Sequence, residues 1–213
     1  MRVDVRRALE PVMETMSRAG ASMPNTVAHK LDPHQLWASL EADPAWHDWQ
    51  EGRMTPRQWH EHLTRRLGVA IDFAEFRGAW NGALDPVTIL DDDLFAALGT
   101  RCRLALLSNT DPLHAEYLDR HFSFGRYFSA RIYSCAVGLS KPSPAIYKAA
   151  LDALGVAPAD ALYIDDIPEY AAAARELGID AIRFEDSPQL IRELKARGLP
   201  TCRSPGSRLP GAS

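Results

Sequence analysis

The sequence is poor in cysteine. Only Cys102, Cys135 and Cys202 occur among 213 residues, and they lie far apart in the chain. An odd number of scattered cysteines excludes a disulfide framework, and their spacing is not that of a metal-binding cluster. We therefore expect unpaired thiols in a reducing compartment.

Long apolar segments and an excess of positive charge are absent as well. No apolar run approaches the roughly 20 residues that cross a bilayer. The segment with Arg2, Arg6 and Arg7 lacks the apolar stretch of a signal peptide. The net charge of −4 provides no basic surface for nucleic acid or an anionic membrane. We expect a cytoplasmic protein with neither nucleic acid nor a membrane as partner.

The composition is that of a soluble globular protein, with 46% hydrophobic and 24% charged residues. A chain of this length fits one domain with a sizeable insertion, or two small domains. We expect a mostly helical cap region over residues 1–85 and an α/β core over 86–200. The tail over 201–213 is rich in Pro, Gly, Ser and Arg, which predicts disorder.

Apolar residues recur at helical spacing in the first region. They predict helices over 8–16, 32–40, 56–67 and 73–80, with Thr55-Pro56 at the start of the third and Gly68 at its end. All five tryptophans lie in this region. They could line a substrate pocket or a partner surface, but the size of indole and its preference for burial favour the core of a helical bundle.

Short apolar runs alternate with helical segments in the second region. We expect strands over 103–107, 130–134, 161–164 and 181–184. This alternation predicts an α/β fold, a Rossmann-like doubly wound parallel sheet carrying a small helical cap. In such a sheet, ligands bind outside the carboxyl ends of the strands.

Ser108, Asn109 and Thr110 directly follow the first of these strands. A hydroxyl and backbone N–H groups that open a helix can cradle an anion. The alternative is an ordinary helix N-cap, because all three residue types cap well.

Lys141 and Pro142 lie in a loop after Gly138. A lysine held by a rigid turn can reach a phosphate oxygen and offset the charge that develops there. The alternative is an exposed surface lysine.

Asp165 and Asp166 follow the third strand. Two adjacent carboxylates repel one another, so the pair indicates a compensating cation, and oxygen ligands suit magnesium. The alternative is a turn before a helix that begins at Pro168.

Taken in order, these groups resemble the motifs of the haloacid dehalogenase (HAD) superfamily. Ser108 matches the second motif, Lys141-Pro142 the third and Asp165-Asp166 the fourth. The residues around them are similar to the sugar-phosphate phosphatase branch, whose small cap the helical region before Pro86 resembles.

The resemblance implies a hydrolase in which an aspartate attacks phosphorus and the aspartyl-phosphate is then hydrolysed, with Mg²⁺ as cofactor. It implies catalytic roles for Ser108 and Lys141, contact of Ser108, Asn109 and Lys141 with the phosphorylated substrate, and magnesium binding by Asp165 and Asp166.

The first motif of the superfamily, an apolar strand that ends in the nucleophilic aspartate, is not found. Asp4 has no apolar strand before it, and Asp91-Asp92-Asp93 continues into a helix. We expect the first central strand of the sheet to be missing too. Either the sequence starts at an internal methionine, or the protein is a degenerate relative. The first explanation is favoured because the match resumes soon after Met1, and the chain as given is then expected to be inactive.

Three functions follow from these residues. The three motifs favour a phosphatase of small phosphorylated metabolites. The missing nucleophile favours a non-catalytic binding or regulatory protein, as do Ile167 and Tyr170, which replace a small polar residue and an asparagine of the family pattern. A 2-haloacid dehalogenase shares the fold without needing magnesium, and the doubled aspartate disfavours it.

Overall fold

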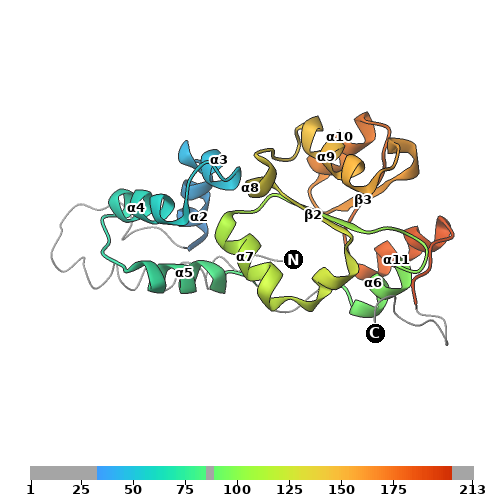
Figure 1. Ribbon diagram of the computed structural model, residues 1–213, viewed down its shortest axis with the longest axis horizontal. Coiled ribbons are helices and arrows are strands. Elements are labelled where there is room, and N and C mark those ends of the chain that lie inside the picture. Colours follow the sequence, from blue (N-terminus) through green and yellow to red (C-terminus); the bar gives the residue numbers. More distant parts are fainter. Residues whose placement is uncertain (1–32, 85–88, 203–213) are drawn as a thin grey trace. The chain divides into compact units, whose positions relative to one another are not determined.

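The computed structural model describes residues 33–84 and 89–202, which form two compact units (Figure 1). The helical unit consists of residues 33–84 and 110–122, and the α/β unit of residues 89–109 and 123–202. The chain therefore returns to the helical unit after the first strand of the α/β unit. The helix expected over 8–16 and most of the tail expected to be disordered lie outside the described residues.

The described helical unit contains five helices: α2 (Pro33–Glu41), α3 (Ala45–Gln50), α4 (Pro56–Leu67), α5 (Phe73–Gly82) and α7 (Pro112–His121). The ends of α4 are those that the sequence predicts. The Thr55 hydroxyl accepts from the Gln58 N–H at 3.3 Å, and the Gln58 side chain accepts from the Thr55 N–H at 2.8 Å. Gly68 ends the helix with a φ of 65°, a left-handed conformation that favours glycine.

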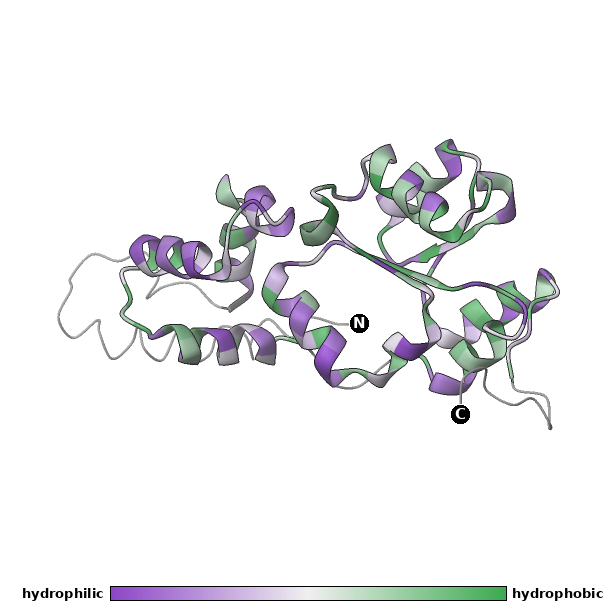
Figure 2. Ribbon diagram, in the orientation of Figure 1, coloured by the Kyte–Doolittle hydropathy of each residue, from purple (hydrophilic) through white to green (hydrophobic). Residues whose placement is uncertain are grey.

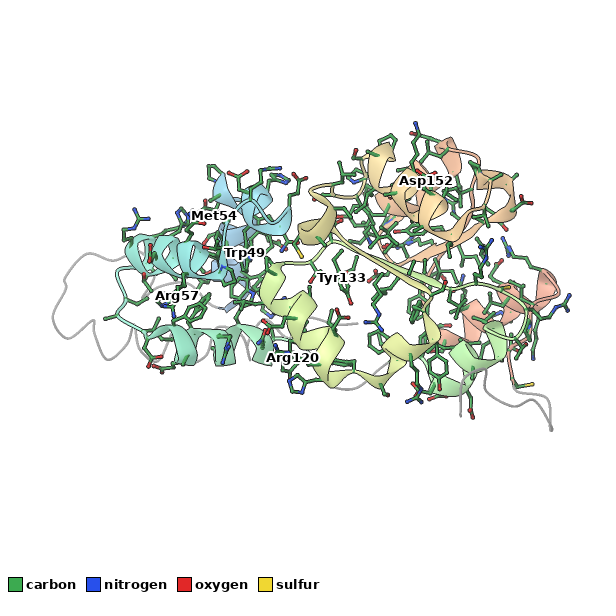
Figure 3. All side chains as sticks on the ribbon, viewed as in Figure 1. Trp49, Met54, Arg57, Arg120, Tyr133 and Asp152 are labelled. Atoms are coloured by element: carbon green, nitrogen blue, oxygen red, sulfur yellow. The ribbon has the colours of Figure 1, made fainter. Side chains whose placement is uncertain are left out.

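Tryptophans fill the core of the helical unit. Trp49, Trp59 and Trp80 are fully buried, and the stacked rings of Trp49 and Trp59 have centroids 5.6 Å apart. Figure 3 shows Trp49 among the side chains of the helical unit. Trp37 and Trp46 are partly buried against the same cluster. The prediction that the tryptophans form a bundle core is confirmed.

A buried ionic network joins α5 to α7. Asp111, the N-cap of α7, accepts from the N–H groups of Leu113 and His114 and from Trp80 Nε1, each at 3.0 Å. His114 Nδ1 lies 2.9 Å from Asp111 Oδ2, and His114 Nε2 lies 2.8 Å from the Trp80 carbonyl oxygen. Both ring nitrogens therefore face acceptors, which requires the doubly protonated imidazolium.

The α/β unit contains the four strands that the sequence predicts, each within two residues of its expected bounds. Its elements are α6 (Asp92–Leu98), β1 (Ala105–Ser108), the 3₁₀ turn η2 (Ser123–Tyr127), β2 (Ala130–Tyr133), α8 (Ser134–Val137), α9 (Pro144–Leu154), the 3₁₀ turn η3 (Pro158–Asp160), β3 (Leu162–Asp165), α10 (Pro168–Glu176), β4 (Asp180–Arg183) and α11 (Ser187–Ala196). Across both units, no helix of the described residues is long and apolar enough to span a bilayer.

The strands form two parallel pairs. β1 pairs with β2, with Leu107 opposite Ile132, and β3 pairs with β4, with Ile164 opposite Ile182. Within residues 33–84 and 89–202, no strand is hydrogen-bonded to the other edge of β1 or of β3. The parallel α/β arrangement is confirmed, but as two ladders instead of one continuous sheet, because no described strand bridges them.

Helices cover both faces of the strands, because successive side chains of a strand point to opposite faces. Ala181 of β4 packs in one apolar cluster with residues of α9 and α10, and Ile182 packs in another with residues of α6 and α11. These helices alternate between apolar and polar residues along their length (Figure 2). The residues of β1 and β3 are only partly buried, unlike the interior strands of a doubly wound sheet.

Candidate functional site

Ser108 and Asn109 stand at the carboxyl end of β1. Ser108 is half-buried, and its hydroxyl makes only a long contact of 3.4 Å with the Asn109 carbonyl oxygen. The N-cap of the following helix is Asp111, so the alternative in which Ser108 or Asn109 caps that helix is wrong. The Ser108 hydroxyl has no strong partner and is suited to bind an anion.

Lys141 links the ends of β1 and β3. Its Nζ lies 2.7 Å from Asp165 Oδ2 and 3.5 Å from the carbonyl oxygen of Leu107, the residue before Ser108. The side chains of Lys141 and Asp165 are only 8% and 9% exposed. The alternative of an exposed surface lysine is therefore wrong, and the two charges are a desolvated pair that compensate one another.

Tyrosines surround this ion pair. The Tyr163 hydroxyl donates to Asp165 Oδ2, since residues 163 and 165 share one face of β3. Burial and the hydrogen bond to Asp165 raise the pKa of Tyr163 far above its usual range, so the phenol is a neutral donor. Burial and the Asp165 charge raise the pKa of Tyr147 to about 12. The Tyr170 ring lies 4.7 Å from Lys141 Nζ, within the range of a cation–π contact.

The Asn109 side chain binds the backbone of Lys141. Its Oδ1 accepts from the Lys141 N–H at 2.8 Å, and its Nδ2 donates to the Lys141 carbonyl oxygen at 3.0 Å and to the Tyr170 hydroxyl at 3.3 Å. Asn109 and Tyr170, which are 61 positions apart in the chain, are thereby hydrogen-bonded to one another, and both contact Lys141.

The model of the haloacid dehalogenase-like hydrolases matches residues 24–178 of the chain. The chain belongs to this family. The match covers the Ser108, Lys141 and Asp165-Asp166 motifs, so the resemblance on which the site was predicted is confirmed as a family membership.

Curated relatives of this HAD-like chain include phosphate-ester hydrolases. It is 36% identical over 80 residues to bifunctional epoxide hydrolase 2 of Sus scrofa, which is 37% of this chain and 14% of the relative. It is 31% identical over 88 residues to flavin mononucleotide hydrolase 1 of Arabidopsis thaliana, covering 41% and 36%. D-ribitol-5-phosphate phosphatase of Bacteroides thetaiotaomicron is 24% identical over 151 residues, covering 68% and 73%. The chain thus spans well under half the length of the first two.

Solved structures share the HAD fold. A HAD family enzyme of Bacteroides thetaiotaomicron, in complex with magnesium and inorganic phosphate, aligns with a TM-score of 0.70 at 23% identity, over 90% of this chain and 93% of its own. An L-2-haloacid dehalogenase of Xanthobacter autotrophicus aligns with a TM-score of 0.53 at 21% identity, over 99% and 88%. At these identities the alignments show the fold alone.

The two adjacent aspartates of the HAD-like site are in different environments. Both oxygens of Asp165 have protein partners, since Oδ1 accepts from the Ile167 N–H at 2.9 Å and Oδ2 from Lys141 and Tyr163. Asp166 is exposed. Its carboxylate is a hard oxygen ligand open to solvent, which suits magnesium. In the part of the chain that the structure describes, no group of three or more His, Cys, Asp or Glu residues could hold a metal ion.

The structure brings together most of the residues predicted from the sequence. Ser108, Asn109, Lys141 and Asp165 are joined through direct contacts or through a neighbouring residue, and Asp166 follows Asp165 in the chain. Sequence reasoning missed Tyr163 and Tyr147 and noticed Tyr170 only as a departure from the family pattern. The alternation along β3 was the available signal for Tyr163, because it places that side chain beside Asp165.

Proposed function

We propose that this chain carries the phosphate- and magnesium-binding half-site of a HAD-like phosphatase that acts on small phosphorylated metabolites. The observation that carries the proposal is the buried Lys141–Asp165 pair at the ends of β1 and β3, beside the weakly bonded Ser108 hydroxyl. The flavin mononucleotide hydrolase and ribitol-phosphate phosphatase relatives support a phosphate ester as substrate.

In this proposal Ser108 and Lys141 hold the phosphate. The Ser108 hydroxyl and backbone N–H groups at the end of β1 donate to phosphate oxygens. The ammonium of Lys141 contacts the carbonyl oxygen of Leu107, the residue before Ser108, so it would neutralise negative charge on the phosphate that Ser108 binds, and its burial would strengthen that interaction.

Asp166 is the residue that would bind magnesium most directly, because its carboxylate faces solvent while that of Asp165 is already held by three protein donors. A bound magnesium ion supplies Lewis-acid stabilisation of the phosphoryl oxygens. Asp165 keeps Lys141 in place beside it. The nucleophile of the family reaction is a further carboxylate. Neither aspartate is proposed for that role, because Asp165 is held by three donors and Asp166 is assigned to magnesium.

The proposal is tested by measuring ester hydrolysis and phosphate binding in the wild-type chain and in variants of the site. The chain is assayed with magnesium on flavin mononucleotide, D-ribitol 5-phosphate and p-nitrophenyl phosphate, and calorimetry measures binding of inorganic phosphate. We expect Lys141→Ala and Asp166→Asn to weaken phosphate binding in the presence of magnesium, and hydrolysis wherever it occurs. The matched control is Lys148→Ala, an exposed lysine of α9. Absence of both binding and hydrolysis would overturn the proposal, and chloride release from a 2-chloro acid would replace it with dehalogenation.

A second candidate is a non-catalytic phosphate-binding protein. It is favoured because both carboxylate oxygens of Asp165 already accept hydrogen bonds from the protein, which leaves this residue less available to a metal ion. Tyr163 and the Ile167 N–H hold this carboxylate in addition to Lys141. This candidate predicts phosphate binding that depends on Lys141 but no hydrolysis of any ester. Turnover that is abolished by Asp166→Asn would contradict it.

A further inference from the structure

We propose that Asn109 and Tyr170 are positioning residues that fix the backbone and the ammonium group of Lys141, and that neither binds the substrate through its side chain. The inference rests on the proposed function for its purpose, since a phosphate is what Lys141 is positioned to meet. The contacts that support it lie entirely within the α/β unit.

Both N–H donors of the Asn109 side chain are already engaged in hydrogen bonds within the protein. A primary amide has two N–H donors, and both are engaged, one with the Lys141 carbonyl oxygen and one with the Tyr170 hydroxyl. The Asn109 Oδ1 also accepts from the Lys141 N–H, so the amide is hydrogen-bonded to both the N–H and the carbonyl oxygen of Lys141. The side chain therefore keeps no donor for a phosphate oxygen, and its effect on a ligand must pass through Lys141.

Tyr170 holds the other end of Lys141. Its ring lies 4.7 Å from Nζ, so the negative face of the π system attracts the ammonium. Its own backbone is anchored, because the hydroxyl of Tyr147, a buried residue of α9, donates to the Tyr170 carbonyl oxygen at 2.9 Å. The ring is thus tied to the packing between α9 and α10.

These contacts restrict the orientation of the Lys141 ammonium group. A lysine has four side-chain torsions and three N–H donors. Asp165 takes one donor at 2.7 Å and the Leu107 carbonyl oxygen makes a weaker contact at 3.5 Å. The ammonium retains donor capacity for a phosphate oxygen, and Asn109 and Tyr170 limit the directions in which it can be offered.

The test uses the small number of lysines. The chain has four, Lys30, Lys141, Lys148 and Lys195, so labelling lysine with ¹³C at Cε yields a spectrum of four resonances. Lys141 is expected to show Hε signals shifted upfield by the Tyr170 ring. Tyr170→Leu should abolish this shift, and Tyr170→Phe should keep it, because phenylalanine restores the ring without the hydroxyl. Asn109→Ala should broaden the Lys141 signal or return it to the position of an exposed lysine.

Calorimetry with inorganic phosphate and magnesium chloride provides the second readout. We expect the dissociation constant of phosphate to rise about tenfold in Asn109→Ala and in Tyr170→Leu, as for loss of one charged hydrogen bond. Tyr170→Phe should change it by less than about threefold, since only a long neutral hydrogen bond is lost. The matched control is Tyr127→Leu, because Tyr127 contacts Asp92, Arg126 and Phe95 of the same unit and none of the residues around Lys141 Nζ named above.

The outcomes separate this inference from the proposed function. Identical Lys141 signals in Tyr170→Leu and Tyr170→Phe, or unchanged phosphate affinity in Asn109→Ala when the wild type binds, would overturn the positioning role. A Lys141 signal that responds as expected in a protein that binds no phosphate would support positioning while refuting the proposed function. Unchanged signals of Lys148 and Lys195 verify that each variant is folded.

Discussion

Two aspartates that are neighbours in the sequence lie in sharply different environments. Asp165 is 9% exposed and held by three donors, whereas Asp166 is exposed, although both belong to the same motif. Removing one member of a buried ion pair leaves the other charge desolvated and unpaired, which costs far more than losing a surface charge. The two aspartates should therefore separate into a residue needed for stability and one needed for ligands.

Asp165→Leu should lower the free energy of unfolding by about 3–5 kcal/mol, the usual cost of breaking a buried pair. Asp166→Ala, the control one residue away, should change it by less than about 0.5 kcal/mol. Urea unfolding followed by circular dichroism measures both. Equal effects of the two substitutions would show that the Lys141–Asp165 pair contributes little.

The stability of the helical unit should depend on pH through His114. Burial alone would lower the pKa of His114, but the Asp111 charge and the hydrogen bonds to Asp111 and the Trp80 carbonyl oxygen outweigh it and raise the pKa. A raised pKa means that the imidazolium stabilises the fold fully below the unfolded value of about 6.5, and that this stabilisation is lost as the pH rises through the folded value.

Tryptophan fluorescence reports this effect, because all five tryptophans are in the sequence of the helical unit. We expect the urea midpoint to fall as the pH is raised from 6 through the alkaline range, and His114→Gln to flatten that slope. A midpoint that falls equally in His114→Gln would assign the dependence to another group.

The helices of this protein are bounded by local chemistry, whereas its strands depend on distant partners. The capping box of Thr55 and Gln58 and the left-handed Gly68 define α4 within about one turn at either end. Each strand instead needs a neighbour elsewhere in the chain to satisfy its backbone. This explains why the residues of α4 were predicted closely, whereas the residue-by-residue register of the strands was not.

Thr55→Ala should destabilise the helical unit by about 1 kcal/mol, the usual cost of an N-cap. Thr55→Ser keeps the capping oxygen and should cost much less. Thermal unfolding followed by tryptophan fluorescence compares the two variants. Equal losses would mean that the methyl group of Thr55, and not its hydroxyl, is what matters.

Ligand binding to the α/β unit should protect the strand ends that carry the site. Phosphate with magnesium at 100 times its dissociation constant stabilises the binding-competent state by about 2.7 kcal/mol through mass action. We expect slower amide hydrogen exchange at Ser108, Asn109 and Asp165 when both are present. In Lys141→Ala the same additions should leave those amides unchanged, and protection that persists there would place the ligand elsewhere.

By itself, the sequence determined where the four strands and most of the helices lie and that the tryptophans form a core, and it predicted that Ser108, Lys141 and Asp165 lie close together. These follow from local periodicity, capping residues and the order of the motifs. Only the tertiary structure decided that Asn109 grips the Lys141 backbone and that Tyr170 lies against the ammonium. It also separated Asp165, whose side chain is buried, from the exposed Asp166, and it set the register of the two parallel strand pairs. Those features depend on contacts between residues 18 to 61 positions apart, and a single sequence holds no record of which distant residues meet.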